Sequence, residues 1–186
     1  LRQGLFRAST KQLLQAATAP SSGMSLDIQL VQRLCFNGEI VAARTCLDRI
    51  EHLAKDAPPL LVAQAHLRWA LGEFQAAKQL MDRAAAAGIN APDQFHLHAT
   101  VLQVTGDVDR AAQVLETCLG CWPTFGDAAV ARSNLRRQTT QSNHLEYLRQ
   151  QLYRLSTSDR TPQAKLVREV FVSALFNELD DLGQHD

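Results

Sequence analysis

The sequence predicts an all-α fold in which antiparallel helical hairpins stack into a right-handed α-α superhelix. Four of the nine glycines recur every 34 residues, as Gly4, Gly38, Gly72 and Gly106. Small and apolar residues recur in fixed columns after these glycines, and prolines stand where the first helix of a hairpin would begin. A fixed period in this range is the sequence signature of solenoid architectures, in which each repeat packs on its neighbours.

The columns after each glycine predict the second helix of a hairpin. Glycine can adopt the left-handed conformation that ends one helix and turns the chain into the next. The residue that follows is acidic, which suits the positive end of a helix. The alanine five positions after the glycine lets two helices approach closely, and apolar residues follow it at helical spacing. These columns contain Glu39, Glu73 and Asp107; Ala43, Ala77 and Ala111; Leu47, Met81 and Leu115; Ile50, Ala84 and Cys118.

The first helix of each hairpin is marked by its start. Ser25 is a candidate N-cap for a helix over 26–36, with Asp27 in its first turn. Pro58 and Pro59 begin the helix that runs to residue 71, because proline suits the first helical positions. Pro92 begins the helix that ends near residue 105, and Pro123 closes that unit.

Over residues 25–125 the sequence resembles the tetratricopeptide repeat (TPR) family. The matching residues are Ala65, Gly72, Phe74, Ala77, Met81 and Ala84 in one unit and Ala99, Gly106, Ala111, Leu115 and Pro123 in the next. Residues 4–16 resemble the second helix of a preceding unit, whereas Lys55 and the missing first-helix tryptophan depart from the family pattern. The resemblance implies a single array over 1–186, comprising a partial repeat 1–23, repeats 24–57, 58–91 and 92–125, a degenerate unit 126–160 and a truncated final repeat 161–186.

After residue 125 the 34-residue register slips. Residues 127–137 predict one helix, and Asn143-x-x-Glu146 resembles a capping box that begins a second helix running to about residue 155. Residues 155–159 predict a polar link before Thr161-Pro162, which caps a helix over 163–182. That helix ends with Gly183, as the first helices of the earlier hairpins end with Gly38, Gly72 and Gly106. We therefore expect it to be the first helix of a hairpin whose second helix is missing, and we expect the polypeptide to continue beyond Asp186.

Residues 155–183 also resemble the last repeats of bacterial TPR proteins that carry a C-terminal sulfotransferase domain. The catalytic residues of that family would lie downstream of this chain. The resemblance therefore implies an alternative function for the chain, namely recruiting substrate for a sulfotransferase.

Composition excludes several classes of protein. Lys+Arg and Asp+Glu are both 19, which gives none of the basic excess of a nucleic-acid binder. We expect the arginine-rich stretch 132–168 to form a solvated helix face. The apolar runs are too short for a membrane span, and four unevenly spaced cysteines do not form a disulfide framework. We therefore expect a reduced, cytoplasmic protein that binds neither nucleic acid nor membrane.

Catalytic and metal-binding motifs are missing from the sequence. Cys118-x-x-Cys121 would need two further ligands to hold zinc, and Cys118 occupies a core column, so we interpret it as a small buried residue. His96 and His98 lie two apart on a predicted helix and face different ways. We expect no enzyme activity, cofactor or metal.

In the TPR family the first helices line a concave groove that binds peptides or protein segments. The resemblance places Ile28, Gln32 and Cys35 in this groove in the first repeat, Val62, His66 and Trp69 in the second, and His96, Thr100 and Gln103 in the third. The residues expected to bind the partner are Gln32, His66, Trp69, His96, Thr100 and Gln103. Trp69 is either a groove anchor or a residue that packs between hairpins.

The expected function is a scaffold that holds a peptide or protein segment in this groove. Members of the family that clamp the tail of a chaperone use Lys and Asn in these columns, where Ile28, Gln32 and His66 stand here, so that partner is not expected. The unpaired last helix makes oligomerisation a further possibility.

Overall fold

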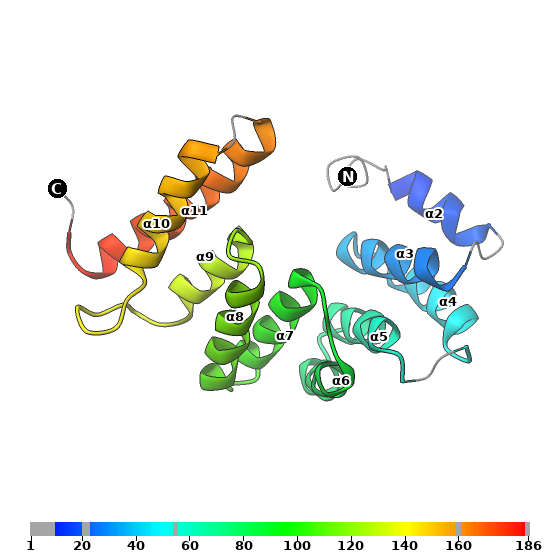
Figure 1. Cartoon of the computed structure of the whole chain (residues 1–186). Coiled ribbons are helices and arrows are strands. Elements are labelled where there is room, and N and C mark those ends of the chain that lie inside the picture. The colour runs from blue at the N-terminus through cyan, green and yellow to red at the C-terminus, as the bar shows by residue number, and fades with distance from the viewer. Residues whose placement is uncertain (1–9, 20–22, 54–55, 159–160, 185–186) are drawn as a thin grey trace. The chain divides into compact units, whose positions relative to one another are not determined.

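The computed structural model describes residues 10–19, 23–53, 56–158 and 161–184. Over these residues the chain is all helical apart from its turns, with an isolated bridge between Thr139 and Ser142 and no strand. The helices are α2 (Thr10–Thr18), α3 (Met24–Phe36), α4 (Ile40–Ile50), α5 (Pro58–Ala70), α6 (Phe74–Ala87), α7 (Pro92–Val104), α8 (Val108–Cys121), α9 (Gly126–Leu135), α10 (Leu145–Ser158) and α11 (Pro162–Asp181). The predicted all-α fold of helical hairpins is confirmed (Figure 1). Gly4 and the rest of 1–9 lie outside the described residues.

The chain forms two compact units that divide between Ile89 and Asn90. Unit 1 contains α2 to α6, and unit 2 contains α7 to α11. Each unit is described by itself below. The repeat boundaries drawn from the sequence stay a prediction.

Unit 1 contains two hairpins, α3 with α4 and α5 with α6, in which the paired helices pack on each other. The first helices α3 and α5 also contact each other, and α2 packs on α3 and α4. Ala43 and Ala77 are fully buried, as their columns predict, because a small side chain lets the two helices of a hairpin approach. In unit 2 the hairpin of α7 and α8 buries Ala111 in the same way.

The hairpin turns use glycine as predicted. Gly38, Gly72 and Gly106 have φ of 76°, 74° and 87°, the left-handed region that favours glycine. In the middle turn, the N–H of Gly72 donates to the carbonyl of Trp69 at 2.9 Å, which satisfies a free carbonyl at the helix end.

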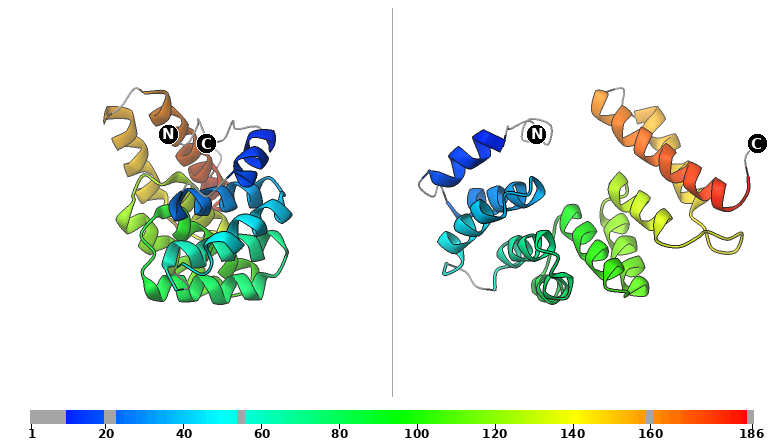
Figure 2. Two further views of the ribbon diagram at one scale, coloured as in Figure 1. Left: turned by 90° about the vertical axis from the view of Figure 1, so that its right-hand side faces the viewer. Right: turned by 180° about the vertical axis from the view of Figure 1, so that it is seen from behind.

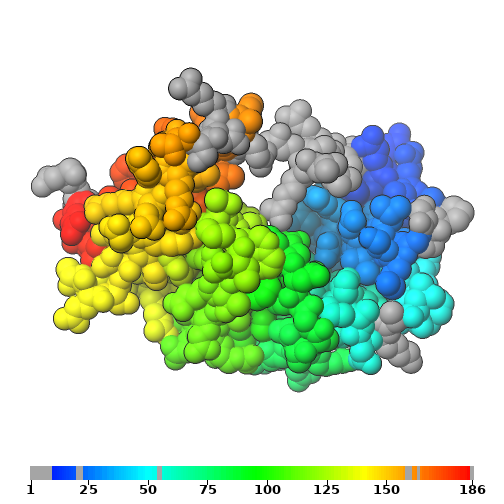
Figure 3. Space-filling view, viewed as in Figure 1, coloured from blue at the N-terminus to red at the C-terminus, as the bar shows by residue number. Residues whose placement is uncertain are grey.

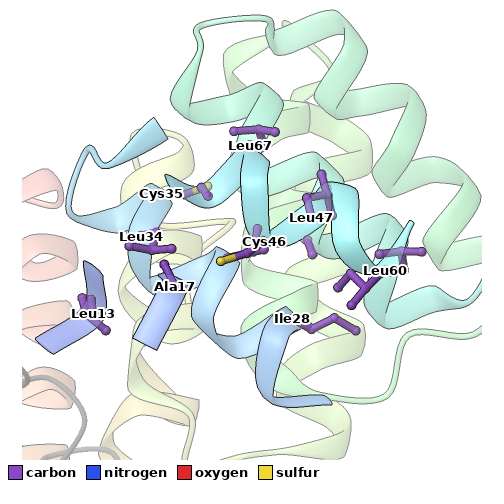
Figure 4. Close-up of a cluster of buried hydrophobic side chains, with 13 residues drawn as sticks. Leu13, Ala17, Ile28, Leu34, Cys35, Cys46, Leu47, Leu60 and Leu67 are labelled. Carbon is purple, nitrogen blue, oxygen red and sulfur yellow. The ribbon is translucent and has the colours of Figure 1, made fainter. Parts of the chain in front are cut away.

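The core of unit 1 is a cluster of aliphatic side chains and two thiols from α2, α3, α4 and α5 (Figure 4). At its edge Arg49 of α4 ties the end of α2 to the start of α3. Its Nη1 donates to the carbonyls of Ala17 at 2.8 Å and Ala19 at 2.9 Å, and its Nη2 donates to Oδ1 of buried Asp27 at 2.8 Å. The charged guanidinium of Arg49 also offsets the cost of burying the Asp27 carboxylate.

The prediction that Ser25 caps α3 is wrong. The N-cap is Gly23, with φ of 123°, and it makes no side-chain cap hydrogen bond. Ser25 is exposed within the first turn of the helix, one residue after its start at Met24. Thr161 does cap α11, because its hydroxyl accepts the N–H of Ala164 at 3.3 Å.

In unit 2 the long helix α11 packs on both α9 and α10. Figure 1 shows α10 in front of α11, and the view from behind shows α11 in front (Figure 2). α9 and α11 run parallel, because Gly126 lies against Val170 while Ser133 bonds Glu178. A Cβ on Gly126 would lie 2.6 Å from Cγ1 of Val170, so glycine is required for this close approach.

Two predicted boundaries in unit 2 are wrong. The helix predicted over 127–137 begins at Gly126 and ends at Leu135. The stretch predicted as a polar link is helical to Ser158. Within this helical segment the hydroxyls of Ser156 and Thr157 donate to the carbonyl of Tyr153, at 2.7 Å and 3.2 Å, and so find partners one turn back.

The prediction of a solvated arginine face is wrong at Arg132. This side chain is half-buried, and its guanidinium lies 4.7 Å from the centre of the Tyr147 ring. Its Nε and Nη2 are buried and have no hydrogen-bond partner. By contrast, Tyr153 and Arg154 of α10 are exposed, and Figure 3 shows α10 at the surface of unit 2.

Candidate partner-binding surface

In unit 1 the predicted binding residues lie on the two first helices that pack together. Gln32 lies on α3, and His66 and Trp69 lie one turn apart on α5. All three side chains are half-buried. The Trp69 ring contacts Phe74 of its own hairpin, with 4.9 Å between ring centres and 59° between planes. Trp69 therefore packs within its hairpin and still exposes part of its ring.

Three further positions of the predicted stripe do not line a surface. Ile28, Cys35 and Val62 are buried, with 6%, 8% and 1% of their surface exposed. Burial raises the pKa of the Cys35 thiol to about 11, which keeps it protonated and unreactive at neutral pH. The apolar stripe by which a helix faces the core is at least about 100° wide. Apolar residues at the border of the predicted groove stripe, such as these three, therefore also belong to the core-facing side.

In unit 2 the predicted binding residues lie on α7. Gln103 is exposed, and the hydroxyl of Thr100 donates to the carbonyl of His96 at 2.8 Å. His96 is half-buried, with its ring 6.3 Å from that of Phe125 at 79°. Burial lowers the pKa of His96, although the nearby carboxylates of Asp127 and Asp93 act in the opposite direction, so the ring is neutral at pH 7.

His98, two residues from His96, is buried with 3% of its surface exposed, so the two rings face different ways as predicted. Cys118 is fully buried and Cys121 is exposed, which confirms Cys118 as a small core residue. Over the residues that the structure describes, no group of three or more potential ligand side chains could hold a metal ion.

A serine, a histidine and a glutamate lie within hydrogen-bond distance in unit 2. Their arrangement is not that of a catalytic triad, in which the histidine lies between the serine and the carboxylate. The Ser133 hydroxyl donates to Oε1 of Glu178 at 2.7 Å, and the His144 backbone N–H donates to Oε2 at 2.6 Å. Nδ1 of His144 lies 2.9 Å from Oε1. A nucleophilic serine needs the histidine as its base, whereas here both groups bond the central carboxylate. This cluster holds helices together.

The sequence reasoning missed this cluster, although one signal was present. Glu178 stands five residues before Gly183, and the same column holds Arg33, Leu67 and Val101 before their glycines. A carboxylate in a column that is apolar in two of the three hairpins indicates a buried polar contact, since a buried charge needs partners.

A depression of about 450 Å³ opens in unit 1, and none of the predicted binding residues lines it. It is lined by Asp48, Glu51, His52, Gln64 and Arg83. Within it, Nε2 of Gln64 donates to Oε1 of Glu51 at 2.9 Å.

Comparison with known proteins supports the fold through solved structures. MamA matches with a TM-score of 0.53 and 16% identity, over 97% of this chain and 90% of that chain. YrrB, described as a TPR protein with an unusual peptide-binding site, matches with a TM-score of 0.51 and 17% identity, over 86% of both chains. No protein-family model and no curated protein matches the chain.

The repeat in the sequence, the hairpins of the structure and these neighbours together make the chain a TPR-like protein in its fold. In the part of the chain that the structure describes, no helix is long and apolar enough to cross a membrane.

Proposed function

We propose that this chain is a protein-interaction module that binds a peptide or protein segment along its first helices. The observation that carries the proposal is the half-exposed Trp69 beside His66 on α5, with Gln32 on the adjacent first helix α3. A tryptophan that keeps part of its ring exposed supplies large contact area at small entropic cost, and such residues dominate binding energies. YrrB has a peptide-binding site on the same fold, which supports the class of ligand.

Within unit 2, His96, Thr100 and Gln103 of α7 are proposed as partner-binding residues in their own right. A neutral His96 offers one ring donor and one acceptor, and the exposed Gln103 amide offers both as well. These groups suit the backbone of an extended segment, whereas Trp69 suits an apolar or aromatic side chain.

The test uses Trp69 as its own reporter. The chain has two tryptophans, so Trp122→Phe leaves Trp69 as the sole source of indole fluorescence. In that background we expect a peptide selected from a display library to change the fluorescence saturably. His66→Ala should weaken its binding by about tenfold, the loss typical of an interface anchor.

The matched control is Gln79→Ala on α6, which is exposed on a second helix of the same unit. Circular dichroism should show unchanged helicity for both variants. A selected peptide that binds the His66→Ala chain as tightly as the parent, or that by titration calorimetry binds a Trp69→Ala chain as tightly, would refute the assignment of this surface.

A further inference from the structure

The depression in unit 1 is built by three consecutive helices, α4, α5 and α6 (Figure 1). Asp48 lies in the last turn of α4, and Glu51 and His52 follow that helix, with Glu51 still at helical backbone angles of φ −59° and ψ −32°. Gln64 of α5 and Arg83 of α6 complete the lining, and α5 packs on both α4 and α6. The volume of about 450 Å³ is within the range of small-ligand sites, about 300–1,000 Å³. All five side chains are polar or charged, so a ligand of this depression should be polar.

The depression carries more negative than positive charge. Oε1 of Glu51 accepts from Nε2 of Gln64 at 2.9 Å, and this neutral amide leaves the charge of the carboxylate in place. The guanidinium of Arg83 is paired with Asp56, whose Oδ1 lies 2.5 Å from Nη2. The charges of Asp48 and Glu51 therefore remain in excess among the lining residues. Both residues also lie at the C-terminal end of α4, where the helix dipole favours a cation.

The equivalent place in unit 2 holds a guanidinium group. The first helices α5 and α9 begin two 34-residue periods apart, so the register continues into α9, beyond the point where the sequence pattern slips. Two periods after Asp48 stands Glu116 of α8, and two periods after Gln64 stands Arg132 of α9. The helices α8 and α9 pack on each other as α4 and α5 do. Arg132 lies close enough to Glu116 for their charges to interact, so unit 2 places its own guanidinium where unit 1 has the shorter Gln64.

We propose that the depression of unit 1 binds the guanidinium group of a ligand, held by Asp48 and Glu51 at the end of α4. A guanidinium offers five N–H donors in a planar fork and can bond two carboxylates at once. Oε1 of Gln64 offers a further acceptor, because the amide uses its nitrogen to reach Glu51. The site shares no residue with the proposed first-helix surface, so it goes beyond the proposed function and does not depend on it.

The first experiment titrates butylguanidinium chloride into the whole chain, labelled with nitrogen-15, and follows the backbone amides by NMR. Saturable shift changes are expected at residues 48–52 and 64, with a dissociation constant on the order of 1 mM because the ligand is small. Butylammonium has the same alkyl chain and charge but a compact donor group, so it should bind at least about threefold more weakly. The capped peptide acetyl-Gly-Arg-Gly-amide distinguishes the sources of the guanidinium: tighter binding than butylguanidinium indicates an arginine of a peptide, and weaker binding a small molecule.

Removing the carboxylate charges should remove most of the affinity. The variant with Asp48→Asn and Glu51→Gln should bind butylguanidinium at least about tenfold more weakly, because its hydrogen bonds lose the charge that strengthens them. The matched control carries Glu146→Gln and Glu169→Gln, which replace two exposed carboxylates of unit 2 and should leave binding unchanged.

Filling the depression from within gives a second test. Gln64→Arg should abolish binding, because it supplies to unit 1 the guanidinium that Arg132 supplies at the same column of unit 2. Gln150→Arg adds an arginine to an exposed position of α10 and should leave binding unchanged. Circular dichroism should show the helicity of the parent chain for every variant, since the replaced side chains are exposed or half-buried.

Several results would overturn the proposal. These are shift changes that do not saturate or that spread over the whole chain, unchanged binding to the Asp48→Asn, Glu51→Gln chain, and unchanged binding to the Gln64→Arg chain. Equal affinity of the parent chain for butylammonium and butylguanidinium would overturn it as well, and that comparison requires no variant to fold. His66→Ala should leave this binding unchanged, so failure of this site and failure of the first-helix surface are distinguishable.

Discussion

At the scale of single residues, Glu178 is a fully buried carboxylate of unit 2. It exposes 0% of its surface and joins α11 to Ser133 of α9 and to His144 before α10. Burial alone would raise its pKa, but the hydrogen bonds from His144 and Ser133 outweigh burial and lower it from 4.5. The positive charge of Arg132 also lies close enough for the two groups to interact. The ionised carboxylate therefore holds three segments of unit 2 together.

Replacing Glu178 by Gln should destabilise unit 2 and remove part of its acid sensitivity. The neutral amide keeps only one acceptor oxygen where the carboxylate uses two, and it loses the charge that strengthens the bonds from Ser133 and His144, so we expect a loss of about 2 kcal/mol in unfolding free energy at pH 7. Because the folded state holds the pKa down, the unfolded state binds more protons below pH 4.5. The stability of the parent chain should then fall as the pH drops through the lowered pKa.

The measurement is urea unfolding at a series of pH values, followed by Trp122 fluorescence in a Trp69→Phe background. The Glu178→Gln chain should lose less stability than the parent over the acid range. The exposed Glu169 provides the control, since Glu169→Gln should leave the pH profile unchanged. Parallel profiles for the parent and the Glu178→Gln chain would contradict the role of this carboxylate.

At the scale of helices, the spacing within a hairpin is set by the alanine column. Ala77 exposes 0% of its surface where α6 packs on α5, so no space remains for a longer side chain. Ala86 lies on the same helix and is exposed. This pair allows overpacking to be separated from changes in helix propensity.

Ala77→Leu should lower the unfolding free energy of unit 1 by about 1–3 kcal/mol, because three added carbons must displace the neighbouring helix. Ala86→Leu should change it by less than about 0.5 kcal/mol, since the added carbons extend into solvent. Urea unfolding followed by Trp69 fluorescence in the Trp122→Phe background measures both. Similar losses for the two variants would show that the column does not set the helix spacing.

At the scale of the whole molecule, the repeated elements could be predicted from the sequence because their causes are local. A positive φ at Gly72 and a close helix contact at Ala77 each require a residue type at one position, and the 34-residue period repeats that requirement. The contacts of Arg49 with Ala17 and of Glu178 with Ser133 join residues 32 and 45 apart. No local pattern predicts such pairs.

The accessibility of the candidate binding residues could be predicted in part for a related reason, whereas their role in binding stays a prediction. A helical stripe gives the side of the helix that faces a groove, so Gln32, His66 and Trp69 are half-exposed as their columns suggest. Ile28 and Val62 occupy the same stripe and are buried, since the exact rotation of each helix depends on its tertiary contacts. The alternative function, substrate recruitment for a sulfotransferase, stays a prediction.

Thiol reactivity tests the packing of both units in one measurement. Cys35 and Cys46 lie in the core of unit 1, Cys118 is buried in unit 2, and Cys121 is exposed. Burial raises the pKa of Cys35 and Cys118 to about 11 and also raises that of Cys46, so thiolate is scarce at all three positions. With a disulfide reagent at neutral pH, one thiol should react rapidly and three only as the chain opens.

Cys121→Ser should remove the fast phase. Because opening limits the slow phases, urea should accelerate them, and a fast reaction at Cys118 in the native chain would contradict the packing of α8.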